Sequence, residues 1–305
     1  MSKAETGFAE PILASAVEVA EAVGAGALFV YVAAVDNPAA LQAAVRPPTR
    51  LVLICRDAAD RRRAQDVSCE FLNVPPFELT RMGQIKVATL IAFSQQALHA
   101  GEAFVFVSGV AGQEIDTLVV MRVGLEYELF QSVGQPKLTE HIRRPVFERV
   151  LTLALELAHE GREGKPVGAL FVVGDHREVQ KYCQEGRINP FRGYPEKERN
   201  VLDDTIRDTV KEIAKLDGAF ILKGNGVILS GGTTLRPALA GEDVSYTLGA
   251  RHAAAAAITA GTKSIAVTIS ESTGTVRVWR RGAMITEIEK APRAMLDGRP
   301  PSTIE

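Results

Sequence analysis

Residues 216–222 read Leu-Asp-Gly-Ala-Phe-Ile-Leu and lead from a turn into a short apolar run. A short apolar run that begins after a turn is typical of a buried strand. The apolar spacing of residues 199–216 predicts an amphipathic helix, which would lead directly into Asp217. A helix that leads into a buried strand is a building unit of α/β folds, so this stretch predicts an α/β domain around it.

Two turns on the C-terminal side of Asp217 predict antiparallel hairpins. One is the Lys-Gly-Asn-Gly sequence at residues 223–226, and the other lies at residues 271–274; apolar runs flank both. Before Asp217, one apolar face beginning at Val146 predicts a helix that ends near Gly161. We therefore expect a mixed α/β domain at residues 145–290.

The first part of the chain alternates helical and extended patterns. The expected helices cover residues 12–23, 37–44 and 84–99, and the expected strands cover residues 27–32, 50–55, 103–108 and 116–123. Apolar strands that alternate with helices are typical of a parallel sheet with helices on its faces. We predict a three-layer α/β domain with a mostly parallel sheet at residues 1–130. A polar linker would follow at residues 131–144, and residues 291–305 would form a tail.

Composition narrows the class of protein. The 305-residue chain has a formal net charge of −2, so no global basic field would hold nucleic acid. No apolar segment has the length of a membrane span and residues 1–10 lack a signal-peptide pattern, so we expect a cytoplasmic protein without a membrane partner. The three cysteines fit neither a disulfide framework nor a zinc site, and Cys55 is expected to be a buried thiol.

Asp217 is the first candidate for chemistry. It precedes a strand, and the small residues Gly218 and Ala219 after it would let a ligand approach the backbone closely. Aspartate and glycine also favour turns on their own. A turn without chemistry therefore explains the same pattern.

The second candidate lies at residues 248–255, which read Leu-Gly-Ala-Arg-His-Ala-Ala-Ala. Gly249 and Ala250 precede a helix start, where free N–H groups and the positive end of the helix dipole favour phosphate. Arg251 adds a forked donor suited to phosphate oxygens, and His252 follows it. A capped helix with a surface arginine is the alternative interpretation.

The third candidate follows the apolar run at residues 265–269. Ser270 would hydrogen-bond a terminal phosphate, and Glu271 would bind Mg²⁺ or Mn²⁺ beside Asp217, since both ions prefer oxygen ligands. A polar hairpin turn is the alternative. A carboxylate for a metal and a helix start for phosphate are the two halves of a nucleotidyl-transfer site.

In their order and spacing, the three blocks resemble the diadenylate cyclase (DAC) domain, the catalytic module that makes cyclic di-AMP. The signature of that family is Asp-Gly-Ala followed by Arg-His-Arg, and the likeness covers residues 145–290. Residues 161–175 look like the archaeal-type branch of the family. Members of that branch carry an N-terminal domain similar to the C-terminal domain of pyruvate kinase, which residues 11–130 resemble.

The resemblance implies that two ATP molecules are condensed into cyclic di-AMP and two pyrophosphates. Each DAC domain would bind one ATP, and two domains of a homo-oligomer would face each other, so that each 3′-hydroxyl attacks the α-phosphate of the other nucleotide. A divalent metal, Mn²⁺ or Mg²⁺, would be held by Asp217 and Glu271. The implied catalytic residues are Asp217, Arg251 and His252, and the implied nucleotide-binding residues are Gly218, Ala219, Gly249, Ala250, Arg251, His252 and Ser270.

Three positions depart from the family pattern. Ala253 replaces the last residue of Arg-His-Arg, Ala250 stands where many members have threonine, and Leu216 stands where some have histidine. The alanine at position 250 removes a hydroxyl near the phosphates, and whatever the family's arginine does at position 253 is absent or supplied elsewhere. A sensor that binds ATP or cyclic di-AMP without making it is therefore the alternative function, and a structural assembly protein with a vestigial site is a third.

Overall fold

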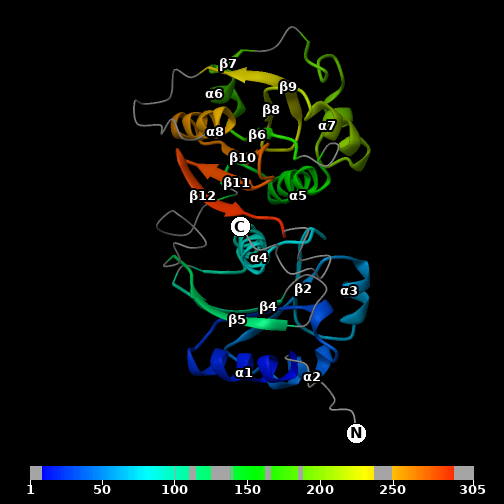
Figure 1. Ribbon diagram of the computed structural model, residues 1–305, viewed down its shortest axis with the longest axis vertical. Coiled ribbons are helices and arrows are strands. Elements are labelled where there is room, and N and C mark those ends of the chain that lie inside the picture. The colour runs from blue at the N-terminus through cyan, green and yellow to red at the C-terminus, as the bar shows by residue number, and fades with distance from the viewer. Residues whose placement is uncertain are drawn as a thin grey trace, which may run out of the picture. The chain divides into compact units, whose positions relative to one another are not determined.

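A computed structural model of the chain describes residues 9–99, 101–109, 115–124, 138, 140–161, 166–184, 188–236 and 249–291. The chain divides into two compact units, one made mainly of residues 1–127 and the other mainly of residues 136–289. Figure 1 labels their helices and strands. Most of the expected linker, and the expected tail from residue 292 onward, lie outside the described residues.

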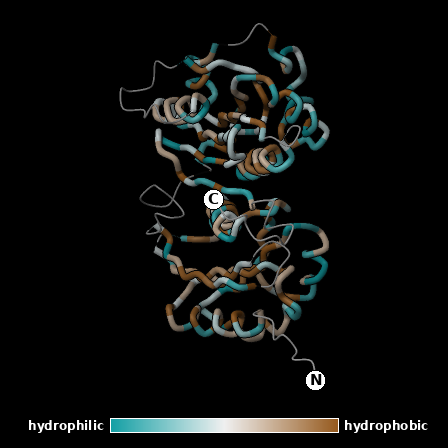
Figure 2. Tube along the Cα trace, viewed as in Figure 1, coloured by the Kyte–Doolittle hydropathy of each residue, from teal (hydrophilic) through white to brown (hydrophobic). Residues whose placement is uncertain are grey.

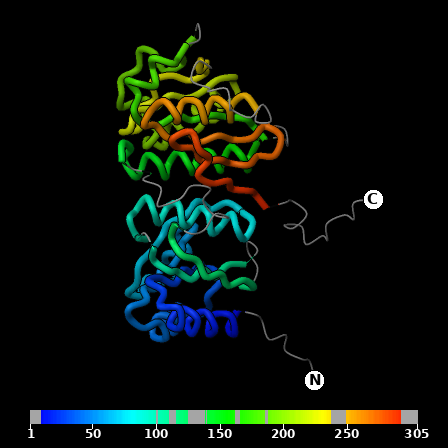
Figure 3. The backbone as a smooth tube through the Cα atoms, turned by 90° about the vertical axis from the view of Figure 1, so that its left-hand side faces the viewer, coloured from blue at the N-terminus to red at the C-terminus, as the bar shows by residue number. Residues whose placement is uncertain are grey.

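The first unit is a three-layer α/β domain. Its helices are α1 (Ala9–Ala22), α2 (Pro38–Ala44), α3 (Ala58–Arg63) and α4 (Arg81–Ser94), and its strands are β1 (Ala27–Tyr31), β2 (Arg50–Cys55), β3 (Glu70–Asn73), β4 (Ala103–Gly109) and β5 (Ile115–Arg122). The sheet order is β3-β2-β1-β4-β5, and every described pair is parallel except β4–β5. Helices α1 and α4 cover opposite faces of the sheet (Figures 1 and 3). The predicted mostly parallel sheet is confirmed.

The strands of this unit form its core, as their hydrophobic colour in Figure 2 shows. Every residue of β1 is buried, and Phe29 stacks on Phe106 of β4 with ring centroids 5.8 Å apart. Cys55 is buried in β2, as expected. The helix predicted at residues 84–99 was placed too late, because Thr80 caps α4 by accepting from the Gly83 N–H, and Gln96 adopts a positive φ of 57° beyond its end.

The second unit is a mixed α/β domain. Its helices are α5 (Arg144–Glu160), α6 (His176–Gln180), α7 (Arg207–Ile213) and α8 (Ala250–Gly261), and its strands are β6 (Ala169–Val173), β7 (Cys183–Gln184), β8 (Ala219–Leu222), β9 (Ile228–Leu235), β10 (Ile265–Ile269), β11 (Val276–Arg280) and β12 (Ala283–Ile288). The sheet order is β12-β11-β10-β6-β8-β9-β7. Helices α5 and α8 pack against β10 from opposite faces (Figures 1 and 3).

Both hairpins of this unit are confirmed, since β8–β9 and β10–β11 are antiparallel pairs. The helix predicted at residues 199–216 is wrong in extent, because only α7 is α-helical within it. The Asn200 side chain accepts a hydrogen bond from the Leu202 N–H at 3.0 Å, and Asp203 accepts one from Thr205 at 2.9 Å. Such local side-chain bonds compete with helix formation. Strand β12 was not predicted.

Strand directions determine which loops meet at each edge of this sheet. Strand β8 is parallel to β6, whereas β10 is antiparallel to β6 and pairs Ile269 with Ala169. The end of β10 therefore lies at the edge where β6 and β8 begin, which brings Gly168, Asp217 and Ser270 to one edge. The loops that follow β6 and β8 lie at the opposite edge.

Candidate active site

The side chain of Arg251 connects the two predicted metal ligands. Its Nη2 donates to Asp217 Oδ1 and its Nη1 donates to Glu271 Oε2, each at 3.0 Å. The Arg251 side chain is 27% exposed, whereas those of Asp217 and Glu271 are 96% and 70% exposed. Both carboxylates are thus oriented by a half-buried cation while most of their surface stays open to a ligand.

Close backbone packing fixes the positions of Arg251 and Asp217. A Cβ on Gly168 would lie 2.7 Å from Arg251 Nη1, so a larger residue there would displace the guanidinium. Gly218 has a φ of +115°, and a Cβ there would lie 2.5 Å from the carbonyl carbon of Gly232. The Asp217 turn therefore depends on a glycine in a conformation that other residues rarely adopt.

The start of α8 opens onto a cavity of about 470 Å³. Gly249 is the N-cap residue and contributes no side-chain cap, so the first turn presents backbone N–H groups that helix geometry leaves without partners. The lining residues are Gly249, Ala250, Arg251, His252, Ile269, Ser270, Glu271, Ser272, Thr273 and Arg277. Free N–H groups, the positive end of the helix dipole and two arginines favour an anionic ligand such as phosphate.

His252 is buried and held by Arg277 of β11. Its Nε2 lies 2.7 Å from Arg277 Nη1, and because a guanidinium only donates, Nε2 accepts and is unprotonated. Burial lowers the pKa of His252, and the charge of Arg277 lowers it further. A neutral imidazole is therefore the form that this pocket favours.

Ser270 follows β10 and is largely buried. Its Oγ lies 3.1 Å from Ser272 Oγ and accepts from the Thr273 N–H at 3.4 Å. Its backbone N–H donates to the Thr275 carbonyl, so the turn that carries Glu271 is closed. The serine hydroxyl is held at the wall of the cavity, where it can bind a ligand oxygen.

Six of the residues that the sequence singled out line one cavity: Gly249, Ala250, Arg251, His252, Ser270 and Glu271. Asp217 reaches this group through Arg251. Gly218 and Ala219 do not line the cavity, and Ala219 is buried in the core cluster with Leu170 and Ala255. Leu248 lies outside the described residues.

Sequence reasoning missed Arg277, Ser272, Thr273 and Gly168. Arg277 lies in β11, whose sequence Val-Arg-Val-Trp-Arg places arginines between apolar residues, and that pattern was the available signal. Gly168 carried no signal, because its importance depends on the approach of Arg251 from a distant helix.

The carboxylates fit a magnesium or manganese ion in part. Two oxygen donors from the protein are sufficient for Mg²⁺ when substrate phosphates and water complete its shell. Among the described residues, no group of three or more His, Cys, Asp or Glu side chains is arranged to hold a metal by itself. The donor set therefore suits an ion that arrives with a nucleotide and not a resident metal.

A mixed α/β domain with paired carboxylates beside a helix start has the architecture of a nucleotide-binding domain. Residues 156–284 match the family described as DisA bacterial checkpoint controller nucleotide-binding, the DAC family. A diadenylate cyclase from Haloferax volcanii is 36% identical over 201 residues, which are 65% of this chain and 72% of that protein. A diadenylate cyclase from Methanocaldococcus jannaschii is 35% identical over 188 residues, 59% of this chain and 57% of that protein. The chain belongs to the diadenylate cyclase family.

A solved structure of DacA from Staphylococcus aureus is similar over 50% of this chain and 91% of that chain, at 20% sequence identity. The TM-score between the two structures is 0.32.

The family prediction for the N-terminal unit was wrong. Residues 9–130 match the family described as probable sensor domain DacZ_P, and not the pyruvate kinase C-terminal domain that we expected. A parallel sheet with helices on both faces is common to many α/β domains, so fold-level features misdirected the comparison. Within the described part of the chain, no helix combines the length and apolar character needed to cross a membrane.

Proposed function

We propose that this protein condenses two ATP molecules into cyclic di-AMP and two pyrophosphates at the Arg251 cavity, with a divalent metal and across two facing copies of its DAC domain. Membership of the diadenylate cyclase family supports the overall reaction. The observation that carries the assignment to this cavity is the pair of 3.0 Å bonds from Arg251 to Asp217 and Glu271.

In this proposal the α8 start and the side chains around it bind the triphosphate. Arg251 would exchange its carboxylate partners for phosphate oxygens, and Ser270 would hydrogen-bond the terminal phosphates. A bound Mg²⁺ or Mn²⁺, held by Asp217 and Glu271, would supply charge neutralisation at the reacting phosphate. Each carboxylate is open enough to accept such an exchange, since both side chains are mostly exposed.

Asp217 would orient and activate the ribose 3′-hydroxyl. The 3′-oxygen attacks the α-phosphorus of the other ATP, the bond from the α-phosphorus to the bridging oxygen breaks, and pyrophosphate leaves with that electron pair. The hydroxyl proton passes to Asp217 or to water. Two such steps close the cyclic dinucleotide, and positioning with charge stabilisation accounts for most of the rate of phosphoryl transfer.

Arg277 is a candidate substitute for the family's arginine, which is absent at position 253. The family pattern places an arginine where this chain has Ala253, and Arg277 lines the same cavity from β11. We propose that Arg277 supplies the cation that Ala253 lacks, while it holds His252 neutral through the 2.7 Å bond. This assignment favours the enzyme over the non-catalytic sensor.

Two facing copies would complete the site, because one copy binds one ATP and leaves Asp217 with a 96% exposed side chain. Water has free access to such a carboxylate, and a second domain would exclude it. We include a cytoplasmic location in the proposal, since ATP is the substrate and the three cysteines are free thiols.

The test is incubation of the purified chain with ATP and Mn²⁺, with products resolved by mass. We expect cyclic di-AMP from the wild type, and an Asp217→Asn variant slower by a factor of about 10² or more. Asp208→Asn, an exposed aspartate of α7, is the matched control. Absence of product from wild type, combined with a thermal shift on adding ATP or cyclic di-AMP, would support the sensor; absence of both would support the assembly protein.

A further inference from the structure

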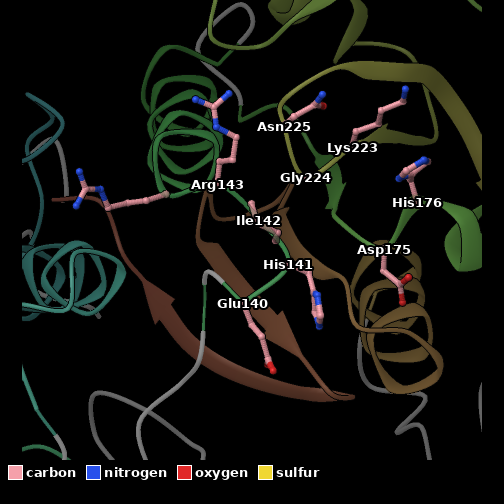
Figure 4. Close-up of a pocket in the computed structure, with 10 residues that line it drawn as sticks. Glu140, His141, Ile142, Arg143, Asp175, His176, Lys223, Gly224 and Asn225 are labelled. Carbon is pink, nitrogen blue, oxygen red and sulfur yellow. The ribbon is translucent and has the colours of Figure 1, made fainter.

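A second cavity, of about 660 Å³, lies in the same unit at the opposite edge of the sheet. Its walls are residues 140–144, the loop after β6 and the loop after β8 (Figure 4). Strands β6 and β8 are the parallel pair among the described strands of this sheet, and ligands of open α/β sheets bind beyond the carboxyl ends of parallel strands. The volume is within the range of small-molecule sites.

Backbone contacts fix the shape of this cavity. The Arg143 N–H donates to the Gly224 carbonyl at 2.9 Å, and the Gly174 N–H donates to the Leu222 carbonyl at 3.1 Å. A Cβ on Gly224 would lie 2.2 Å from the His141 carbonyl oxygen, so the two loops meet only because glycine is present. The side chain of Ile142 is buried beneath them. The cavity therefore has walls that are formed before any ligand binds.

Charged side chains divide between two sides of the cavity. Figure 4 shows Arg143, Asn225 and Lys223 extending in one direction and the carboxylates of Glu140 and Asp175 extending in the other. The carboxylates are engaged elsewhere, because Glu140 accepts from Arg280 and Asp175 accepts from the Lys263 N–H, at 2.9 and 2.8 Å. On the opposite side Lys223 pairs with Glu196, so the excess positive charge there comes mainly from Arg143.

Arg143 is the strongest candidate for ligand contact. Its exposed side chain has no hydrogen-bond or ion-pair partner among the residues that the structure describes. Lys223 pairs with Glu196 and remains 25% exposed. Burial lowers the pKa of His176, which also lines the cavity, and the charge of Lys223 lowers it further, as expected where cations cluster. Asn225 uses its Oδ1 to accept from the Val227 N–H, which leaves its amino group as a donor.

Helix α5 adds to the positive field. It begins after Arg143 without a side-chain cap and with no acidic residue in its first turn. A cation at the positive end of a helix dipole is unfavourable, and an anion there reverses the sign of the interaction. Arg144 is offset by Glu148, whose Oε1 lies 3.9 Å from its Nε, and Arg143 beside it is balanced if the cavity receives an anion.

We infer that this cavity binds a phosphate-bearing small molecule, with Arg143, Lys223 and the Asn225 amino group contacting its phosphate oxygens. The inference does not depend on the proposed function. A planar guanidinium, a lysine ammonium and a neutral donor on one side of the cavity match the several oxygens of a phosphate group.

The test measures binding of four probes to the full chain by isothermal titration calorimetry: inorganic phosphate, pyrophosphate, ATP and cyclic di-AMP. An Arg251→Gln background removes the main phosphate contact of the first cavity. We expect at least one probe to bind this variant, and its affinity to fall at least tenfold on adding Arg143→Gln and Lys223→Gln. Lys197→Gln, an exposed lysine outside the cavity, is the matched control, and Arg143→Lys should retain part of the affinity.

The pattern of binding identifies the kind of ligand. For example, a cavity that binds pyrophosphate but not ATP does not accept a ligand that carries a nucleoside. The inference is overturned if no probe binds the Arg251→Gln variant, or if the added substitutions leave the affinity unchanged while circular dichroism shows a folded protein. Cyclic di-AMP formation by the Arg143→Gln, Lys223→Gln double variant with Arg251 intact reports separately on the proposed function.

Discussion

Arg251 donates a 3.0 Å hydrogen bond to Asp217, a residue 34 positions earlier in the chain. The same guanidinium pairs with Glu271, also at 3.0 Å, so it lies between the two carboxylates that we propose as metal ligands. Arg251 therefore neutralises part of the charge of both carboxylates in the structure.

Arg251→Gln is expected to raise the affinity of the ATP-free protein for Mn²⁺ while it lowers cyclic di-AMP formation. Two exposed ion pairs contribute about 0.2–1 kcal/mol each, so the gain in affinity should be on the order of tenfold. Electron paramagnetic resonance, which detects free Mn²⁺, measures this affinity in the absence of ATP. Arg62→Gln, on an exposed turn of α3, is the control, and an affinity that is unchanged or weaker than in wild type would refute competition between Arg251 and the metal.

Gly218→Ala is expected to destabilise the protein far more than Gly232→Ala, although both glycines have positive φ. A Cβ on Gly218 meets the Gly232 carbonyl carbon at 2.5 Å, whereas the nearest atom to a Cβ on Gly232 is 3.5 Å away. We expect a loss of unfolding free energy of about 3 kcal/mol for the first and about 1 kcal/mol for the second. Denaturant titration provides the comparison, and equal losses would show that backbone conformation alone is responsible.

The free energy of unfolding should depend on pH through His252. Burial lowers its pKa in the folded state, so the unfolded state binds the proton more readily. The contribution of the neutral His252 side chain to the free energy of unfolding is fully present above the pKa of an unfolded histidine, about 6.5. It is lost as the pH falls through the lower pKa of His252 in the folded state. Denaturant titrations between those limits should show a smaller pH dependence for His252→Gln than for wild type, with His159→Gln as the control; identical slopes would contradict the buried neutral imidazole.

Much of the fold could be predicted because apolar runs mark its strands. The runs at β1 and β6 are continuous, and the hairpin turns carry glycine. The helix before Asp217 was overestimated because Asn200 and Asp203 form local turns that apolar periodicity does not reveal. Strand β12 was missed because its stability comes from pairing with β11, a contact that the sequence does not state.

The candidate site was predicted from the three sequence blocks around Asp217, Arg251 and Ser270. These blocks do not reveal which side chains from distant elements meet in the fold. Family resemblance identified Asp217, Arg251 and Glu271, and the structure brings them into contact. It could not identify Gly168, whose role is to leave space for an arginine from α8, or Arg277, which reaches His252 from another strand. Contacts of this kind depend on packing between distant elements.

The exposure of the Asp217 side chain has a consequence for how much messenger a cell makes. If a productive site needs two copies, the output of an unpaired population rises with the square of the number of chains, because encounters limit it. Synthesis would then rise more steeply than abundance, so sparse chains would consume disproportionately little ATP without any change in the chemistry of the site.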